Sequence, residues 1–192
     1  MAHAENFPDA AADEVVKQIG ALLPGQFIAN PPAEGEVTLS ETFEVWILDG
    51  NAVTQPTDSL RQLARPTGYR HHQVFIKGAA KLFARSTPPD AATGRWRVTE
   101  VFESELAGKI DEAIDLIDSM DRDDIDDPLV RLLIAPTYQT HAFWLLSDTK
   151  DDQVLVLSRP PEFTSLRTDQ LLSQGEFLEA LRGEQHIIGR LR

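Results

Sequence analysis

The sequence predicts a single α+β domain, 1–192, in which three or four helices pack on a mostly antiparallel sheet of about six or seven strands. Its composition is that of a globular protein, because 42% of the 192 residues are apolar and 26% are charged. Its periodicities run helix, strands, helix, strands, helix, which is not the strict alternation of a doubly wound sheet. The chain has no cysteine, so the core must form without disulfides.

The first third of the chain predicts two helices with a strand between them. Residues 9–23 repeat apolar side chains at helical spacing between two prolines, which predicts an amphipathic helix. Apolar side chains then fall on alternate positions over 37–47, the pattern of a strand. A short helix over 57–64, with a threonine or aspartate cap, follows.

Residues 69–85 predict a β-hairpin whose turn decides which side chains share a face. A three-residue loop at 78–80 sets Phe75 opposite Phe83. It also brings four apolar side chains together on one core face: Val74, Ile76, Leu82 and Ala84. A two-residue loop would mix apolar and charged groups on one face, so the three-residue loop is preferred.

A third strand over 95–102 and a helix opened by Ser104 follow the hairpin. Trp96 and Val98 are expected to point inward from this strand. The helix is expected to bury an apolar stripe and to carry acids on its outer face. The residues of the stripe are Leu106, Ile110, Ala113, Ile114 and Ile117.

The last third of the chain predicts a β-meander and a helix. Three apolar runs joined by short links form the meander: 129–135, 140–147 and 153–158. A capping box beginning at Ser173 opens the last helix, which is expected to stop at Gly183.

Charge is distributed unevenly along the chain. The net charge is −13, but residues 61–97 hold eight basic side chains and one acid, and 103–127 hold eleven acids and two basic side chains. The overall charge disfavours non-specific adhesion to nucleic acid or anionic membranes. The simplest interpretation of the two segments is that they neutralise one another across the fold.

Several classes of function lack their signature in this sequence. The absence of cysteine excludes thiol catalysis, cysteine-ligated zinc and iron–sulfur clusters. No phosphate-binding loop, dinucleotide fingerprint, nucleophile elbow or zinc-protease motif occurs, and no cofactor is expected. The chain also lacks a secretory signal pattern and a long apolar run, which favours a cytoplasmic protein without a membrane segment.

Histidines and acids are the remaining candidates for catalysis or metal binding. His72 and His141 could serve as a catalytic base or ligand if both meet a carboxylate in a cleft, whereas the adjacent His71 must point to the opposite face from His72. The acidic run 121–127 fails the calcium-loop pattern, because Ile125 occupies a ligand position. We therefore expect a solvated acidic linker and no metal site.

The outer face of the predicted hairpin is the best candidate for a binding surface. Aromatic rings among basic groups can stack on bases, hold phosphates or bind a partner peptide. The candidate binding residues are Phe75, Lys77, Lys81, Phe83, Arg85, Arg95 and Arg97. The alternative is that a helix covers the two phenylalanines.

Three segments of the chain, 69–78, 83–86 and 127–134, resemble parts of a known family. They read Tyr-Arg-His-His-Gln-Val-Phe-Ile-Lys-Gly, Phe-Ala-Arg-Ser and Asp-Pro-Leu-Val-Arg-Leu-Leu-Ile. They resemble segments of uncharacterised bacterial proteins, cyanobacterial ones among them. The resemblance implies no activity, and no functional residue is carried over from it.

Two hypotheses of function follow from these observations. The first is a non-enzymatic cytoplasmic domain that binds another protein or a second copy of itself; the net charge argues against nucleic acid. The alternative is a small-ligand protein or an enzyme that uses His72 or His141 in a cleft. An exposed aromatic face favours the first hypothesis, and a cavity with a converging histidine and carboxylate favours the second.

Overall fold

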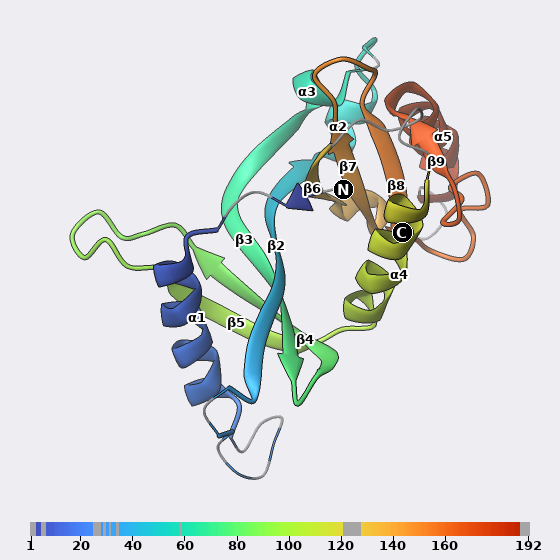
Figure 1. The fold of residues 1–192 in the computed structure, drawn as a ribbon. Helices are drawn as coiled ribbons and strands as arrows, with labels where there is room; N and C mark the ends of the chain where they lie inside the picture. The colour runs from blue at the N-terminus through green and yellow to red at the C-terminus, as the bar shows by residue number, and fades with distance from the viewer. Residues whose placement is uncertain are drawn as a thin grey trace. The chain divides into compact units, whose positions relative to one another are not determined.

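The computed structural model describes residues 3–4, 7–24, 28, 30, 32–33, 35–57, 59–120 and 128–188 (Figure 1). Its elements are β1 (His3–Ala4), α1 (Asp9–Leu22), β2 (Val37–Leu48), α2 (Gly50–Val53), α3 (Leu60–Leu63), β3 (Ala64–Ile76), β4 (Ala79–Thr87), β5 (Arg97–Glu103), α4 (Leu106–Ser119), β6 (Leu129–Ala135), η1 (Pro136–Tyr138), β7 (Thr140–Leu146), β8 (Gln153–Ser158), β9 (Leu171–Ser173) and α5 (Gln174–Ile188).

The chain divides into two compact units. The α1 unit comprises Ala4–Glu44 and Gly68–Asp111, and the α5 unit comprises Met1–His3, Val45–Thr67 and Glu112–Arg192. The long strands β2 and β3 contribute residues to both units. Whether the chain acts as one domain stays a prediction.

The strands confirm the α+β class. Hydrogen-bonded neighbours follow the order β5-β4-β3-β2-β6-β7-β8-β9, with β1 beside β6. The β2–β6 pairing is parallel, whereas the β3–β4, β4–β5, β6–β7, β7–β8 and β8–β9 pairings are antiparallel. The sheet is therefore mostly antiparallel, as the sequence predicts, with a few more strands than expected.

In the α1 unit, α1 packs on one face of the sheet. Val15 and Ile19 of α1, with Leu23 directly after it, form a buried cluster with apolar residues of β2, β3, β4 and β5. Gln18 fixes the contact with β5, because its Nε2 donates to Trp96 O at 2.8 Å and its Oε1 accepts the N–H of Val98 at 2.9 Å. The predicted first helix is thus confirmed to within one residue of its end.

The β3–β4 turn corrects the predicted hairpin register. The turn has two residues, Lys77 and Gly78, both with positive φ (53° and 79°), a conformation that suits the twist of a hairpin. A bulge after Val74 then shifts the pairing by one residue, so that Val74 lies opposite Leu82. The three-residue loop and the pairing of Phe75 with Phe83 are therefore wrong, because the bulge restores the apolar face without them. The predicted core face itself is confirmed, with Ile76 packed against buried Val74, Leu82 and Ala84.

In the α5 unit, the predicted meander is confirmed. β6, β7 and β8 pair in antiparallel order, and a short strand that the sequence does not predict, β9, joins their edge. Phe177, Leu178 and Leu181 of α5 pack into one buried cluster with residues of these strands, among them Trp144. The capping box is present: Ser173 Oγ accepts the N–H of Glu176 at 3.2 Å.

Three helices differ in detail from the prediction. The helix predicted over 57–64 is a single turn, Leu60–Leu63, and β3 begins directly after it. The buried residues of α4 include Ala107 in place of the predicted Leu106 and Ile114, which are half-buried. α5 continues past Gly183 to Ile188, because Gly183 does not adopt the positive φ that ends a helix.

Candidate functional site

His72 lies in the core of the α1 unit between two hydroxyl groups. Its Nδ1 is 2.9 Å from Thr42 Oγ1 and its Nε2 is 2.7 Å from Ser86 Oγ. Burial, assisted by the positive charge of Arg70, lowers the pKa of His72 to about 4, so the ring is neutral near pH 7. The side chain is fully buried, so a substrate would reach it only if the core opened. His72 thus links two strands through a buried hydrogen-bond chain.

His141 lies on β7 in the α5 unit. Its ring is half-buried, and its Nδ1 is 3.0 Å from Ser158 Oγ on β8. His72 and His141 therefore belong to different units. Among the described residues, no three histidine, aspartate or glutamate side chains are grouped as a metal site requires. The acidic run 121–127 lies outside the described residues.

The two phenylalanines of the predicted binding face do not form an exposed platform. Phe83 is fully buried, and its ring centroid lies 6.0 Å from those of both Phe102 and His71. Phe75 is half-buried and lies opposite Ala80. On the same face of the sheet, Gln73 donates its Nε2 to Ala107 O of α4 at 2.9 Å. The helix therefore lies against this face, which is the alternative that the sequence left open.

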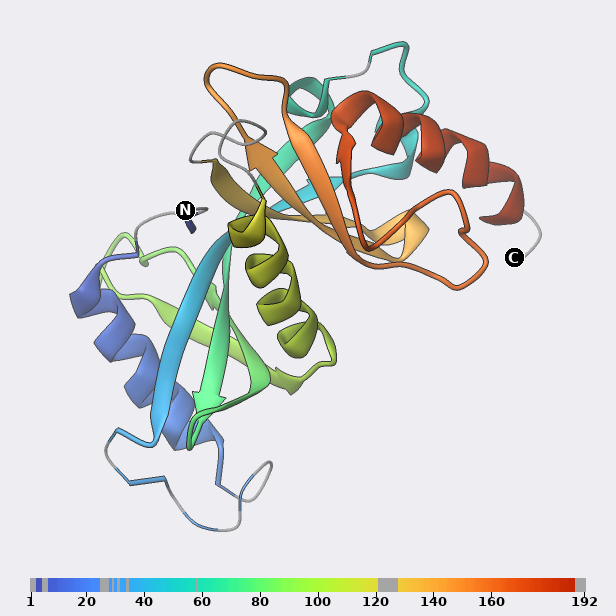
Figure 2. The same cartoon turned by 45° about the vertical axis from the view of Figure 1, so that its right-hand side comes forward.

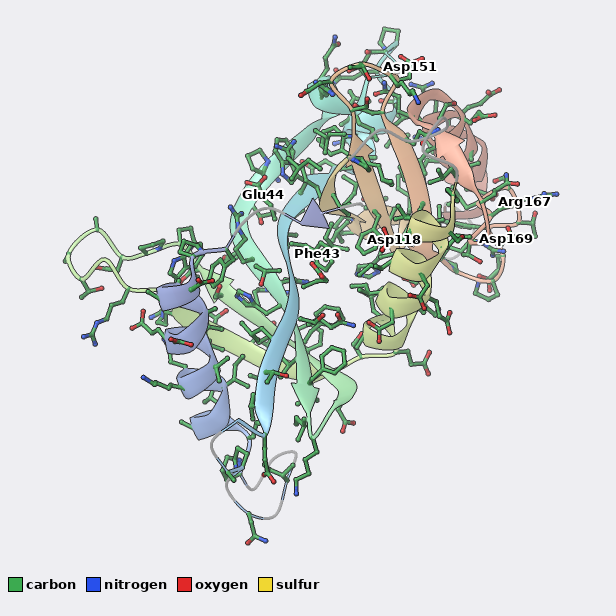
Figure 3. The ribbon with its side chains drawn as sticks, in the orientation of Figure 1. Phe43, Glu44, Asp118, Asp151, Arg167 and Asp169 are labelled. Atoms are coloured by element: carbon green, nitrogen blue, oxygen red, sulfur yellow. The ribbon has the colours of Figure 1, made fainter. Side chains whose placement is uncertain are left out.

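The basic residues around this face pair with nearby acids. Arg85 Nη1 lies 3.1 Å from Glu100 Oε2, and Arg85 Nε donates to His71 Nε2 at 3.0 Å. Further ion pairs join Lys77 with Glu36 at 3.6 Å, Arg95 with Glu14 at 3.7 Å, and Arg70 with Glu44 (labelled in Figure 3) at 3.3 Å. None of these acids comes from 103–127, so these pairs do not join the two charged segments of the sequence.

Arg97 and Lys81 are the other two basic residues of the predicted face. Arg97 is exposed on β5, opposite Thr87. The side chain of Lys81 lies outside what the structure describes, although its backbone belongs to β4. The structure thus surrounds much of the predicted basic surface with local acids, and its contact with a partner stays a prediction.

The first part of β2 forms an edge of the sheet in the α1 unit. On one side it faces β3, where the N–H of Lys77 donates to Glu36 O at 2.9 Å. On the other side, β6 pairs with β2 only at Val45–Ile47. Within the described part of the chain, residues 37–40 thus have a neighbouring strand on the β3 side alone.

The backbone groups on this open edge can be assigned from the strand geometry. In an antiparallel pair, the N–H and C=O of one residue point to the same side, and successive residues alternate. Because Glu36 faces β3, Val37 and Leu39 point their N–H and C=O groups to the open side. An edge of this kind is a template for pairing with another strand.

A groove of about 710 Å³ lies between the start of β2 and one flank of α1. It is lined by Ala12, Asp13, Val16, Lys17 and Gly20 of α1, by Pro32, Ala33 and Gly35 before β2, and by Val37, Thr38 and Leu39 of β2. Gly35 has a φ of +81°, and the carboxylate of Glu36 accepts the N–H of Ala33 at 2.9 Å, which closes the turn into β2. The volume is in the range of open clefts that bind ligands.

The sequence contains one signal for this groove. The apolar pattern of the first helix does not distinguish residues that face the sheet from residues that line the groove. The buried stripe of α1 is Ala11, Val15 and Ile19. A second row of small or apolar residues at the same four-residue spacing, Ala12, Val16 and Gly20, lines the groove. Two adjacent rows indicate that one side of α1 packs on the sheet and a neighbouring side lines the open groove.

No family model matches the chain, and neither the curated proteins nor the solved structures include a match. Of the helices in the described ranges, none has both the length and the apolar character needed to cross a membrane.

Proposed function

We propose that this chain is a protein-binding domain that holds an extended segment of a partner protein as an added strand on the edge of β2. One observation carries the proposal: the open strand edge at 37–40 lies directly beside the groove along α1. Strand addition is a recurring mode of peptide recognition in which main-chain hydrogen bonds give affinity and side-chain pockets give selectivity.

The backbone of β2 supplies the first part of the interaction. Val37 and Leu39 offer two N–H donors and two C=O acceptors to the incoming strand. A hydrogen bond contributes only about 0.5–1.5 kcal/mol net, so these bonds alone give weak binding. Alternate side chains of the bound segment enter the groove and bury apolar surface against Val16, which adds the rest.

The rest of the described surface supports a groove in preference to a flat interface. Among the described residues, the exposed large apolar side chains are Leu22 and Tyr69. The surface that these described residues form therefore has no broad apolar patch. The net charge of −13 and the ion-paired arginines also disfavour nucleic acid as the partner. The proposal keeps the sequence-based expectation of a cytoplasmic location.

The test uses random decapeptides displayed on phage and selected on the full chain. Synthetic peptides from the selection are expected to slow amide hydrogen exchange at Val37 and Leu39. Leu39→Pro removes the edge donor and is expected to weaken binding by about tenfold or more, equivalent to about 1.4 kcal/mol. Leu39→Ala is the matched control, because it also removes the groove-lining leucine side chain but keeps the N–H; the weakening of about tenfold by Leu39→Pro is therefore measured relative to Leu39→Ala.

Two results would overturn the proposal. One is equal affinity of the Leu39→Pro and Leu39→Ala variants for the selected peptides when both variants are folded by circular dichroism. The other is exchange protection confined to a different part of the chain. Sedimentation velocity without peptide tests the second copy as an occupant: self-association that Leu39→Pro abolishes would replace the partner protein by another copy of this chain.

A further inference from the structure

Two opposite charges stand on the α1 side of the groove. Asp13 and Lys17 are both exposed, both line the groove, and neither forms an ion pair with a described residue. The neighbouring acid Glu14, by contrast, lies on the other flank of α1 and pairs with Arg95. As far as the described residues go, both charges can therefore face a segment bound along the groove.

The spacing of the two charges matches that of alternate residues in a strand. Four helical residues rise by about 6 Å, so Asp13 and Lys17 are about 6 Å apart along the axis of α1. Two residues of an extended strand span about 6.8 Å, and residues two apart point to the same face. Side chains at positions i and i+2 of a bound segment can therefore face Asp13 and Lys17 together.

The direction of α1 sets the order of the charges. α1 and the start of β2 run in opposite directions in both ribbon views (Figures 1 and 2). A strand added antiparallel to β2 therefore runs in the direction of α1 and passes Asp13 before Lys17. Antiparallel pairs are the commoner and slightly more stable kind.

We propose that the groove selects extended protein segments with a basic residue followed two positions later by an acidic one. The basic side chain faces Asp13, and the acidic side chain faces Lys17. The long stem of an arginine or lysine at the first position can also cover Val16 while its charged end reaches Asp13. This inference rests on the proposed strand addition and names the partner that it takes.

The experiment uses three synthetic decapeptides that differ at two positions, with Arg-Val-Glu, Glu-Val-Arg or Ala-Val-Ala at the centre. The natural chain is expected to bind the Arg-Val-Glu peptide about tenfold more tightly than the Glu-Val-Arg peptide. The double variant Asp13→Lys/Lys17→Asp keeps the net charge and is expected to invert this order of affinities. Raising the salt from 0.1 M to 1 M is expected to shrink both differences, because exposed charges are screened.

The outcomes separate this inference from the proposed function. Equal binding of all three peptides, with exchange protection still at Val37 and Leu39, would overturn the charge selection and leave strand addition standing. Preference for Glu-Val-Arg by the natural chain would overturn the antiparallel order. Absence of protection at Val37 and Leu39 with every peptide would overturn the proposed function itself.

Discussion

The two units each bury an ionisable side chain, and they hold it in different charge states. In the α1 unit, His72 is neutral between Thr42 and Ser86. In the α5 unit, Asp152 is charged: burial would raise its pKa, but hydrogen bonds from Arg61, the N–H of Ser147 and Trp144 outweigh burial and lower it.

The difference lies in the partners, because both side chains are nearly inaccessible to solvent. Hydroxyl groups satisfy a neutral imidazole, since each can donate or accept, and burial then disfavours the charged ring. A guanidinium with two N–H groups on one carboxylate stabilises the charged form more than burial opposes it. Similar burial thus gives a neutral link in one unit and a charged one in the other.

The largest expected effects test whether the two units unfold in one cooperative transition. Phe83 of the α1 unit and Phe177 of the α5 unit are both fully buried. Replacing either by alanine is expected to cost about 3–5 kcal/mol, because the change removes apolar contacts and leaves a cavity. Urea unfolding followed by circular dichroism is expected to give one transition whose midpoint falls in both variants. Two separate transitions, each sensitive to one variant, would mean that the units fold independently.

Removing the charged link should have the next largest effect. Asp152→Ala leaves the indole N–H of Trp144 and the guanidinium of Arg61 without their acceptor, and we expect a loss of about 3 kcal/mol. Asp152→Asn keeps one acceptor oxygen and should lose less. Equilibrium unfolding in urea at pH 7 measures both values. Equal stability of Asp152→Ala and the natural chain would contradict the assigned role.

The pH dependence of the free energy of unfolding should distinguish His72 from Asp152, because the two side chains titrate in different pH ranges. The pKa of His72 falls from 6.5 in the unfolded chain to about 4, so the unfolded state binds more protons between these values. Stability is therefore expected to decrease as the pH falls from about 6.5 to about 4, by about 1.4 kcal/mol per pH unit at most. The stabilisation from the lowered pKa of Asp152 is fully present above the usual aspartate pKa, so Asp152 adds a pH dependence only at lower pH, where that stabilisation is lost.

The variant that tests this assignment is His72→Gln, which keeps a polar side chain without an imidazole. It is expected to be less stable at pH 7 but to lose the slope between pH 6.5 and 4 in thermal melts. A slope that persists unchanged in His72→Gln would mean that another group titrates there. Asp152→Asn should keep that slope, since its own contribution lies below this window.

Local signals in the sequence predicted the elements that depend on one stretch of chain. The meander, α1 and the capping box at Ser173 were predictable, because hydrophobic period and cap chemistry act within a few residues. The register of the β3–β4 hairpin was not, since the bulge after Val74 shifts the pairing without changing the pattern. Non-local packing decided the rest, as the burial of Phe83 against Phe102 illustrates.

The candidate site was less predictable than the fold for the same reason. The histidines could be singled out by residue type, but only the structure placed His72 between two hydroxyls. The groove depends on where β6 stops pairing with β2 and on which flank of α1 stays open. Residues 12, 16 and 20 were the one local signal, and they gain meaning only beside an open strand edge.

The smallest expected effects come from one glycine in each unit, and they have opposite signs. Gly183 lies inside α5, and a Cβ there would meet nothing within 4 Å, so Gly183→Ala is expected to stabilise by about 0.5–1 kcal/mol. Gly78 also has open space around it, but its φ is +79°, so Gly78→Ala should destabilise by about 1 kcal/mol. Because space is equal at the two positions, backbone conformation alone sets the sign. Thermal melts of the two variants in one buffer measure it, and a destabilised Gly183→Ala would mean that α5 ends at Gly183, as the sequence first predicted.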